Sequence, residues 1–382
     1  MPPLRSLWSG HWQVPWTIAL VGCGVVGRAM LLALTTLGRF DFILVDVKRY
    51  TIHHVSTKQC AVRERGRYKA EVLAELARRR GSRAIAFPGD ITVLGDGVFG
   101  NRTLVVAALD SIPALLATNQ LARRMRLPLL RLNTAPSVGI ASAWLYATHR
   151  PHGACVACGM TEAALEKLKD VPSTTTASTY GCGPGTSMLL AEMAAQLGRH
   201  MMQSLLTLNP RANSYWDCEY QVSLPAGNRL VSTVPHRPGC SFCRLIPWEN
   251  PIFCSSQASS GTLRQVIRAA VGSRERRARI RFCHRLARQA HCVQCQHKSE
   301  LLKWLPAYTS LVGICDRCGG PLVADSPVIE APVRSLGSML DLPLQTLSLP
   351  RGAVVSVQVK NRTHAFVFGA IQHSGYRLEN VS

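Results

Sequence analysis

The fold of this 382-residue chain is decided by the stretch TIALVGCGVVGRAMLLAL, residues 17–34. Its first residues are apolar or β-branched and predict a strand. Three glycines at the spacing G-x-G-x-x-G follow, namely Gly22, Gly24 and Gly27, and apolar residues at helical spacing come after them. In a strand–turn–helix unit such glycines let the backbone turn, approach phosphates and bring helix and strand close together. The stretch therefore predicts a nucleotide-binding α/β domain.

The chain continues to alternate between expected strands and helices. Strands are expected at 40–46, 84–90, 103–109 and 127–135, with helices at 68–80 and 114–125. This rhythm predicts a doubly wound, mostly parallel sheet of the Rossmann type. A more antiparallel part is expected from residue 141, followed by an apolar helix over 186–206 and a hairpin formed by 213–224 and 229–235.

Three residues beside the expected glycine turn could handle a nucleotide. Asp46 ends the second strand, where a carboxylate can accept hydrogen bonds from ribose hydroxyls. Lys69 begins the next helix and can reach phosphates, and Asp110 follows a strand at the carboxyl edge, where it could hold Mg²⁺. The glycine turn and Asp46 alone leave an NAD-dependent oxidoreductase as the obvious candidate. Lys69, Asp110 and paired cysteine motifs, which have no evident place in hydride transfer, argue against it.

The cysteines indicate metal binding. Eight of the 14 cysteines form four CxxC pairs: Cys155/Cys158, Cys240/Cys243, Cys292/Cys295 and Cys315/Cys318. The last two pairs have the spacing of a zinc ribbon, whereas the first two are too far apart for a local finger. Without a secretion signal, metal binding is favoured over disulfides, and redox chemistry at the CxxC pairs is the alternative.

The charge balance indicates an acidic partner. The chain carries 44 Lys and Arg against 22 Asp and Glu, a net charge of +22. Nucleic acid, an acidic protein or a polyanion such as ATP would each fit. No apolar stretch is long enough to span a membrane and no signal-peptide pattern begins the chain, so we expect a cytoplasmic protein with no membrane partner. The densest basic run, 273–289, is expected to be the solvated face of a helix, with docking to nucleic acid or an acidic protein as the alternative.

Taken together, these motifs resemble the ThiF/MoeB superfamily, the ATP-dependent activating enzymes for ubiquitin-like and sulfur-carrier proteins. The stretches that carry the resemblance are GCGVVG (22–27), LVD (44–46), GRYK (66–69), AALDSIPALLATN (107–119), GCGPGTSMLLAEMAAQL (181–197) and the first two CxxC pairs. The resemblance covers about residues 15–245. It implies that the glycine turn and Lys69 bind ATP phosphates, that Asp46 binds the ribose and that Asp110 binds Mg²⁺.

The resemblance also implies a reaction. The C-terminal carboxylate of a ubiquitin-like or sulfur-carrier protein would attack the α-phosphate of ATP and give an acyl-adenylate and pyrophosphate. Many relatives then pass the acyl group to a cysteine, for which Cys182 is the first candidate and Cys254 the second. The two distant CxxC pairs would close one structural zinc site.

One segment departs from the family pattern. Where relatives have an S-N-L-x-R-Q-like stretch whose Asn and Arg touch the nucleotide, this chain has HHVSTKQC, residues 53–60. His54 falls at the Asn position, and Lys58 stands for the Arg after one extra residue. Lys48 occupies the position of a second acidic residue.

The organisation expected from the sequence has four parts. They are a ThiF-type ATP-binding adenylation domain over 1–255, a basic helical linker over 256–289, a zinc-ribbon module over 290–325 and a small β-rich unit over 326–382. The expected partners are the carrier protein, a conjugating enzyme and, by resemblance, a second copy of this chain. A non-catalytic scaffold that binds protein or nucleic acid, and an NAD-dependent oxidoreductase, are the alternative functions.

Overall fold

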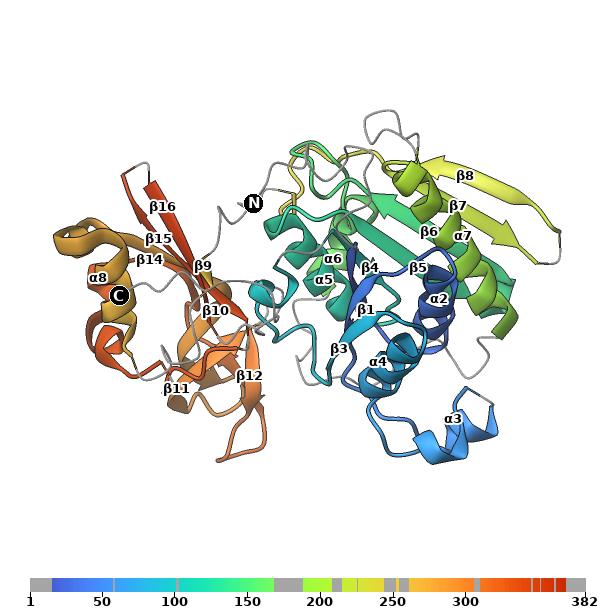
Figure 1. Ribbon diagram of the computed structural model, residues 1–382. Helices are drawn as coiled ribbons and strands as arrows, with labels where there is room; N and C mark the ends of the chain where they lie inside the picture. The colour runs from blue at the N-terminus through green and yellow to red at the C-terminus, as the bar shows by residue number, and fades with distance from the viewer. Residues whose placement is uncertain are drawn as a thin grey trace. The chain divides into compact units, whose positions relative to one another are not determined.

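The computed structural model describes residues 16–57, 59–100, 103–167, 188–207, 215–224, 226–243, 252–253, 261–305, 310–344, 346–350, 352–360 and 362–368. The chain divides into two compact units (Figure 1). The first unit takes its residues from 1–91, 101–161 and 178–246, and the second from 92–100, 162–177 and 247–382.

The first unit is built on an eight-stranded mixed sheet in the order β3-β2-β1-β4-β5-β6-β7-β8. Its parallel strands are β1 (Thr17–Val21), β2 (Asp41–Val45), β3 (Arg83–Phe87), β4 (Leu104–Ala107) and β5 (Leu129–Ala135). Strands β6 (Ile140–Tyr146), β7 (Cys218–Ser223) and β8 (Arg229–Thr233) continue it antiparallel. The α/β fold, the parallel strands β1 to β5 and the terminal hairpin match the sequence expectation, and the structure adds the parallel order 3-2-1-4-5.

The longer helices of the first unit cover the sheet with apolar faces, whereas the short helix over 52–56 buries none of its residues. The α-helices are α2 (Val25–Thr35), α3 (Ile52–Ser56), α4 (Lys69–Arg79), α5 (Ile112–Arg124) and α7 (Met188–Thr207), and short 3₁₀ turns are η1 (Val62–Glu64), η3 (Pro136–Val138) and η4 (Val156–Gly159). Side chains of α2, α4 and α7 share one buried cluster with β1, β2 and β4–β6. Helix α2 is apolar around most of its circumference because it packs on the sheet and on α7.

The second unit is organised around the long strand β10 (Arg279–Cys292). This strand pairs antiparallel with β11 (Lys298–Leu305), β13 (Pro321–Ala324), β14 (Val328–Pro332) and β15 (Ala353–Val359). The sheet extends through β12 (Leu311–Ile314), β16 (Arg362–Phe368) and β9 (Ile252–Phe253), and the remaining elements are α6 (Glu162–Lys167), α8 (Leu263–Val271), η2 (Asp96–Phe99), η7 (Gly272–Arg277) and η8 (Val333–Asp341).

The expectation of a helix through the basic run 273–289 is wrong. Helix α8 ends at Val271, the chain forms a 3₁₀ turn to Arg277, and β10 begins at Arg279. From 279 to 282 arginines alternate with Ile280 and Phe282, which are buried while the arginines are not. That period of two is the pattern of a strand with one buried face. Strand β10 ends at Cys292, the first cysteine of the third CxxC pair, so the expected linker and the expected ribbon share this strand. Strands β14 and β15 of the expected C-terminal unit pair with it.

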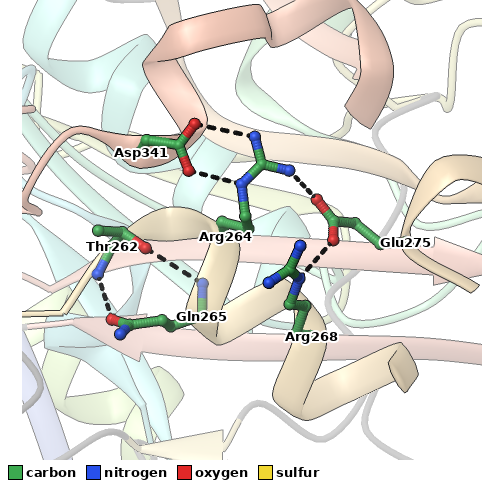
Figure 2. A network of polar contacts seen from close by, with 6 residues as sticks. All are labelled: Thr262, Arg264, Gln265, Arg268, Glu275 and Asp341. Atoms are coloured by element: carbon green, nitrogen blue, oxygen red, sulfur yellow. Dashed lines mark hydrogen bonds and ion pairs between the residues drawn. The ribbon is translucent and has the colours of Figure 1, made fainter. Parts of the chain in front are cut away.

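A network of ion pairs joins α8, η7 and η8 (Figure 2). The guanidinium of Arg264 contacts the carboxylates of both Asp341 and Glu275, and Arg268 Nε lies 2.7 Å from Glu275 Oε2. Thr262 begins α8 as a capping box with Gln265, whose Oε1 accepts from the Thr262 amide at 2.8 Å. The apolar face of α8, including Leu263 and Ile267, lies in the core of this unit.

Among the described residues, no helix has the length and apolar character needed to cross a bilayer.

Candidate nucleotide site and cysteine clusters

The glycine turn after β1 has three sterically different positions. Gly22 has φ +94°, and a Cβ there would lie 2.2 Å from the carbonyl oxygen of Ala108. A Cβ on Gly27 would lie 1.9 Å from the carbonyl oxygen of Gly22. A Cβ on Gly24 would meet nothing within 4 Å. Two glycines are therefore required by packing inside the protein, and the third borders open space.

That open space lies at the N-terminus of α2. Gly24 is the residue before the helix, and no side chain caps the helix there. The first amides of a helix have no partner within the helix and carry the positive end of its dipole. An anion fits this position, because it would accept from amides that no protein side chain caps.

The carboxylate of Asp46 is tied to the same turn. Its Oδ2 accepts from the amide of Cys23 at 2.7 Å, and its Oδ1 accepts from the amide of Lys48 at 2.7 Å. Burial raises the pKa of Asp46, and these two backbone hydrogen bonds act in the opposite direction. The acid expected at the ribose thus lies directly against the glycine turn.

Lys69 is the first residue of α4 and is only 6% exposed. Its Nζ lies 2.9 Å from His54 Nε2 and 5.4 Å from the centre of the Tyr50 ring. Burial lowers the pKa of Lys69, while the charges of Asp46 and Asp110 raise it. Lys69 therefore contacts His54 and lies close enough to both acids for their charges to affect its pKa.

Asp110 follows β4, and Lys48 Nζ lies 3.8 Å from its Oδ2. The next residue, Ser111, caps α5: its hydroxyl oxygen accepts from the amide of Ala114 at 3.5 Å. An oxygen ligand at this sheet edge suits Mg²⁺. Lys48, which occupies an acidic position of the family pattern, thus contacts the carboxylate expected to bind the metal.

A cavity of about 460 Å³ lies along α2 beside this turn. Residues Val25, Ala29 and Leu32 from one face of α2 form one wall. Met188 and Ala191 of α7 and residues 59–62 form the others. Val25, the first residue of α2, lines the cavity, whereas Gly24, Asp46 and Lys69 do not.

The first two CxxC pairs meet in the first unit. Cys155 Sγ lies 3.8 Å from both Cys158 Sγ and Cys240 Sγ, and Cys158 Sγ lies 3.4 Å from Cys243 Sγ. Four thiolates around Zn²⁺ at about 2.3 Å would lie roughly 3.8 Å apart, so the donor set fits a closed tetrahedral zinc site. Asn119 of α5, which is fully buried, accepts from the amide of Val156 at 3.1 Å and ties this cluster to the sheet domain.

The last two pairs form a second cluster in the second unit. Cys292 Sγ lies 3.4 Å from Cys318 Sγ, and Cys295 Sγ lies 3.8 Å from Cys315 Sγ. Gly319 has φ +74° and donates its amide to the carbonyl of Cys315, as a knuckle turn requires. Cys295 and Cys318 are exposed, whereas the first cluster has two buried and two partly buried members. Both clusters can hold a metal ion, and the second is the more accessible.

The cysteines described outside the clusters are all buried: Cys23, Cys60, Cys218 and Cys283. Burial raises the pKa of Cys23, Cys60 and Cys218, so these thiols are poor nucleophiles at neutral pH. The expected nucleotide residue Lys58 and the expected thioester residues Cys182 and Cys254 lie outside the described residues.

Sequence reasoning missed two residues beside Lys69. Tyr50 is 3% exposed, and its ring meets that of His54 edge-on at 5.6 Å. Arg28 of α2 lies 3.4 Å from the Tyr50 hydroxyl and 3.5 Å from Glu64. Tyr50 belongs to no quoted motif, and Arg28 lies in the quoted stretch 17–34 without an expected role. No local pattern distinguishes a tyrosine that will be buried beside a lysine.

Comparisons with known proteins found similar solved structures and one matching family. Among solved structures, this chain is similar to E. coli MccB with ATP, at 19% identity and a TM-score of 0.45 over 60% of this chain and 66% of that one. It is also similar to E. coli MccB alone, at 18% identity and a TM-score of 0.47 over 62% of this chain and 67% of that one. A third similar structure is PaaA, at 13% identity and a TM-score of 0.43 over 58% of this chain and 64% of that one. No curated protein matches the chain. The model of the ThiF family matches residues 15–304, which is most of the sequence, and the chain therefore belongs to the ThiF family.

Proposed function

We propose that this protein uses ATP to adenylate the C-terminal carboxylate of a ubiquitin-like or sulfur-carrier protein. The observation that supports this most is the convergence at one sheet edge of the uncapped α2 N-terminus, the open space at Gly24 and the buried amine of Lys69. Membership of the ThiF family supports adenylation in general. The choice of carrier protein rests on the resemblance of the quoted motifs.

In this proposal the chain's own groups bind and orient ATP. The first amides of α2 and the amine of Lys69 bind its phosphates. Each oxygen of Asp46 accepts one backbone bond, and an ionised carboxylate has about four acceptor sites, so capacity remains for the ribose hydroxyls. Asp110 and its neighbouring waters would hold Mg²⁺, which would neutralise charge on the phosphates.

The chemistry is a displacement at phosphorus. An oxygen of the carrier's carboxylate forms a bond to the α-phosphorus, the bond to the bridging oxygen breaks, and pyrophosphate leaves with that oxygen and its electron pair. Negative charge grows on the leaving group during this step. Lys69 and the α2 amides would stabilise that charge from fixed positions, which is the main source of rate enhancement in such sites.

Later steps of the proposal involve residues outside the described ranges. Cys182 would accept the acyl group as a thioester, with Cys254 as the second candidate. Zinc would occupy both four-cysteine clusters and, with four thiolates each, leave no open position for catalysis. The ribbon cluster would recruit a conjugating enzyme, and the protein would form a homodimer.

Carrier-dependent exchange of labelled pyrophosphate into ATP tests the proposal. The full-length protein is incubated with ATP, Mg²⁺ and a small protein that ends in glycine, and then without that protein. Exchange that requires the carrier and is lost in Lys69→Met supports adenylation. ATP binding without exchange for any carrier favours the scaffold, and tight NAD(H) binding without ATP binding favours the oxidoreductase.

A further inference from the structure

The contact between Lys69 and His54 bears on whether the Lys69 side chain is protonated. A lysine that is to bind phosphate should be an ammonium ion, yet this one is almost completely buried against an imidazole. An imidazole can bond an ammonium only through an unprotonated nitrogen. The protonation of Lys69 therefore depends on which nitrogen of His54 carries the proton.

The hydrogen-bond partners of His54 Nδ1 determine which ring nitrogen carries the proton. His54 Nδ1 lies 2.9 Å from the amide nitrogen of Thr51 and 2.7 Å from its hydroxyl oxygen. A backbone amide can only donate, so Nδ1 must be the acceptor. In the neutral ring the proton then resides on Nε2, and Nε2–H points at Lys69 Nζ. An ammonium at that place would face an N–H group, whereas an uncharged amine would accept its hydrogen bond.

We propose that His54 is the positioning residue of Lys69: it donates Nε2–H to an uncharged Lys69 amine in the ligand-free protein, and phosphate binding adds one proton from solvent to that amine. This inference rests on the proposed function for the identity of the anion, but not for the state of the pair. In the proton step an N–H bond forms on Lys69 while an O–H bond of hydronium or of a buffer acid breaks, and water or the buffer's conjugate base remains in solution.

The charged and titratable groups around the pair come from every element packed against it. Asp46 after β2 and Asp110 after β4 favour the ammonium, and Lys48 disfavours it. Tyr50 contributes an apolar ring face, and burial raises its own pKa to about 12, so it stays neutral. Burial lowers the pKa of His54, and the neighbouring His53 and Lys48 act in the same direction. Burial lowers the pKa of Lys69 more than the two acids raise it.

Histidine at position 54, where the family pattern has asparagine, changes the hydrogen bond that is offered to Lys69. An asparagine has an amide oxygen that could accept from the ammonium form of Lys69. A histidine fixed by Thr51 offers a donor instead. His54 thus sets the protonation of Lys69 before the ligand arrives, and nucleotide binding becomes linked to pH.

The direct test is a titration of the lysine side chains by NMR in the full-length protein labelled with ¹³C,¹⁵N-lysine, without ligand. The Lys69 signal is identified by its loss in Lys69→Met. We expect Lys69 to titrate at lower pH than the surface lysines, and His54→Asn to move it toward them. His53→Asn is the matched control, because His53 is exposed and its ring lies against His54 and not against Lys69. This substitution should leave the Lys69 titration unchanged.

A Lys69 signal that titrates with the surface lysines, or that is the same in His54→Asn and wild type, overturns the proposal. This result is independent of whether ATP is a ligand, so it separates failure of the inference from failure of the proposed function. Where ATP binds, calorimetry in buffers of different ionisation enthalpy should show uptake of about one proton above the Lys69 midpoint, and affinity should fall about tenfold per pH unit. His54→Asn should lose most of that uptake, whereas equal uptake in both proteins contradicts the proposal.

Discussion

The glycine turn allows a ligand effect to be separated from a packing effect within one motif. Replacing Gly27 by alanine would put a Cβ 1.9 Å from the carbonyl oxygen of Gly22, whereas ordinary contacts lie at 3.4 Å or more. Helix α2 would have to move away from β1 by roughly 1.5 Å, against a close-packed core. Replacing Gly24 by alanine would meet nothing within 4 Å, and its φ of −73° is accessible to alanine.

The magnitudes follow from these distances. Overpacking of this kind costs about 1–3 kcal/mol, and alanine recovers up to about 1 kcal/mol of helix propensity, so Gly27→Ala should lose about 1–2 kcal/mol. In a unit of this size that loss lowers Tm by about 2–8 °C. Gly24→Ala should change stability by less than about 0.5 kcal/mol. Its methyl group would occupy the space that we assign to phosphate and weaken ATP binding at least about tenfold, or about 1.4 kcal/mol.

Differential scanning calorimetry, which can resolve the transitions of the two units, and isothermal titration with ATP measure the two effects. Gly27→Ala should lower the transition of the first unit alone. Gly24→Ala should keep the wild-type transition and lose affinity. If Gly24→Ala binds ATP as tightly as wild type, the open space is not a phosphate position. If it is as unstable as Gly27→Ala, the steric argument is incorrect.

Three further predictions concern the metal clusters, the thioester and the second unit. Metal analysis should find about two zinc ions per chain, and Cys240→Ser and Cys295→Ser should each lose one, with the exposed ribbon site yielding its zinc to a chelator first; one zinc or none in wild type contradicts this. Cys182→Ala should abolish a reductant-sensitive adduct with the carrier and leave pyrophosphate exchange intact, whereas Cys254→Ala should retain the adduct; an adduct that persists in Cys182→Ala excludes that residue. Burial raises the pKa of Glu275, but hydrogen bonds and charge from Arg268 and Arg264 outweigh it and hold the pKa below its usual range. The stability that this carboxylate contributes is therefore present above its unfolded-state pKa and lost as pH falls through the folded value, so the Tm of the second unit should fall in acid. The Glu275→Gln substitution should cost about 1 kcal/mol of stability at neutral pH and make the Tm less dependent on pH. A Glu275→Gln protein with the wild-type pH profile would refute the assignment.

The sequence by itself determined the parallel part of the first unit. Each strand there is a short apolar run and each helix has its own periodicity, so local patterns were sufficient for β1 to β5 and for α2, α4 and α5. The glycine spacing even distinguished the turn at Gly22 from an ordinary loop. The CxxC spacing likewise indicated four pairs of metal-binding thiols, because two ligands three residues apart already define half of a tetrahedral site. That the first two pairs share one site was implied by the family resemblance and not by their spacing.

Tertiary structure alone decided the rest. The arginine-rich run became strand β10 because alternate apolar residues such as Ile280 and Phe282 enter a core built by α8, β15 and β16, and a local charge count carries no information on those partners. The pairing of Lys69 with His54 depends on segments 15 residues apart in the chain meeting beside Tyr50. Burial and hydrogen-bond direction arise only when distant segments meet, and these two quantities set the protonation of the site.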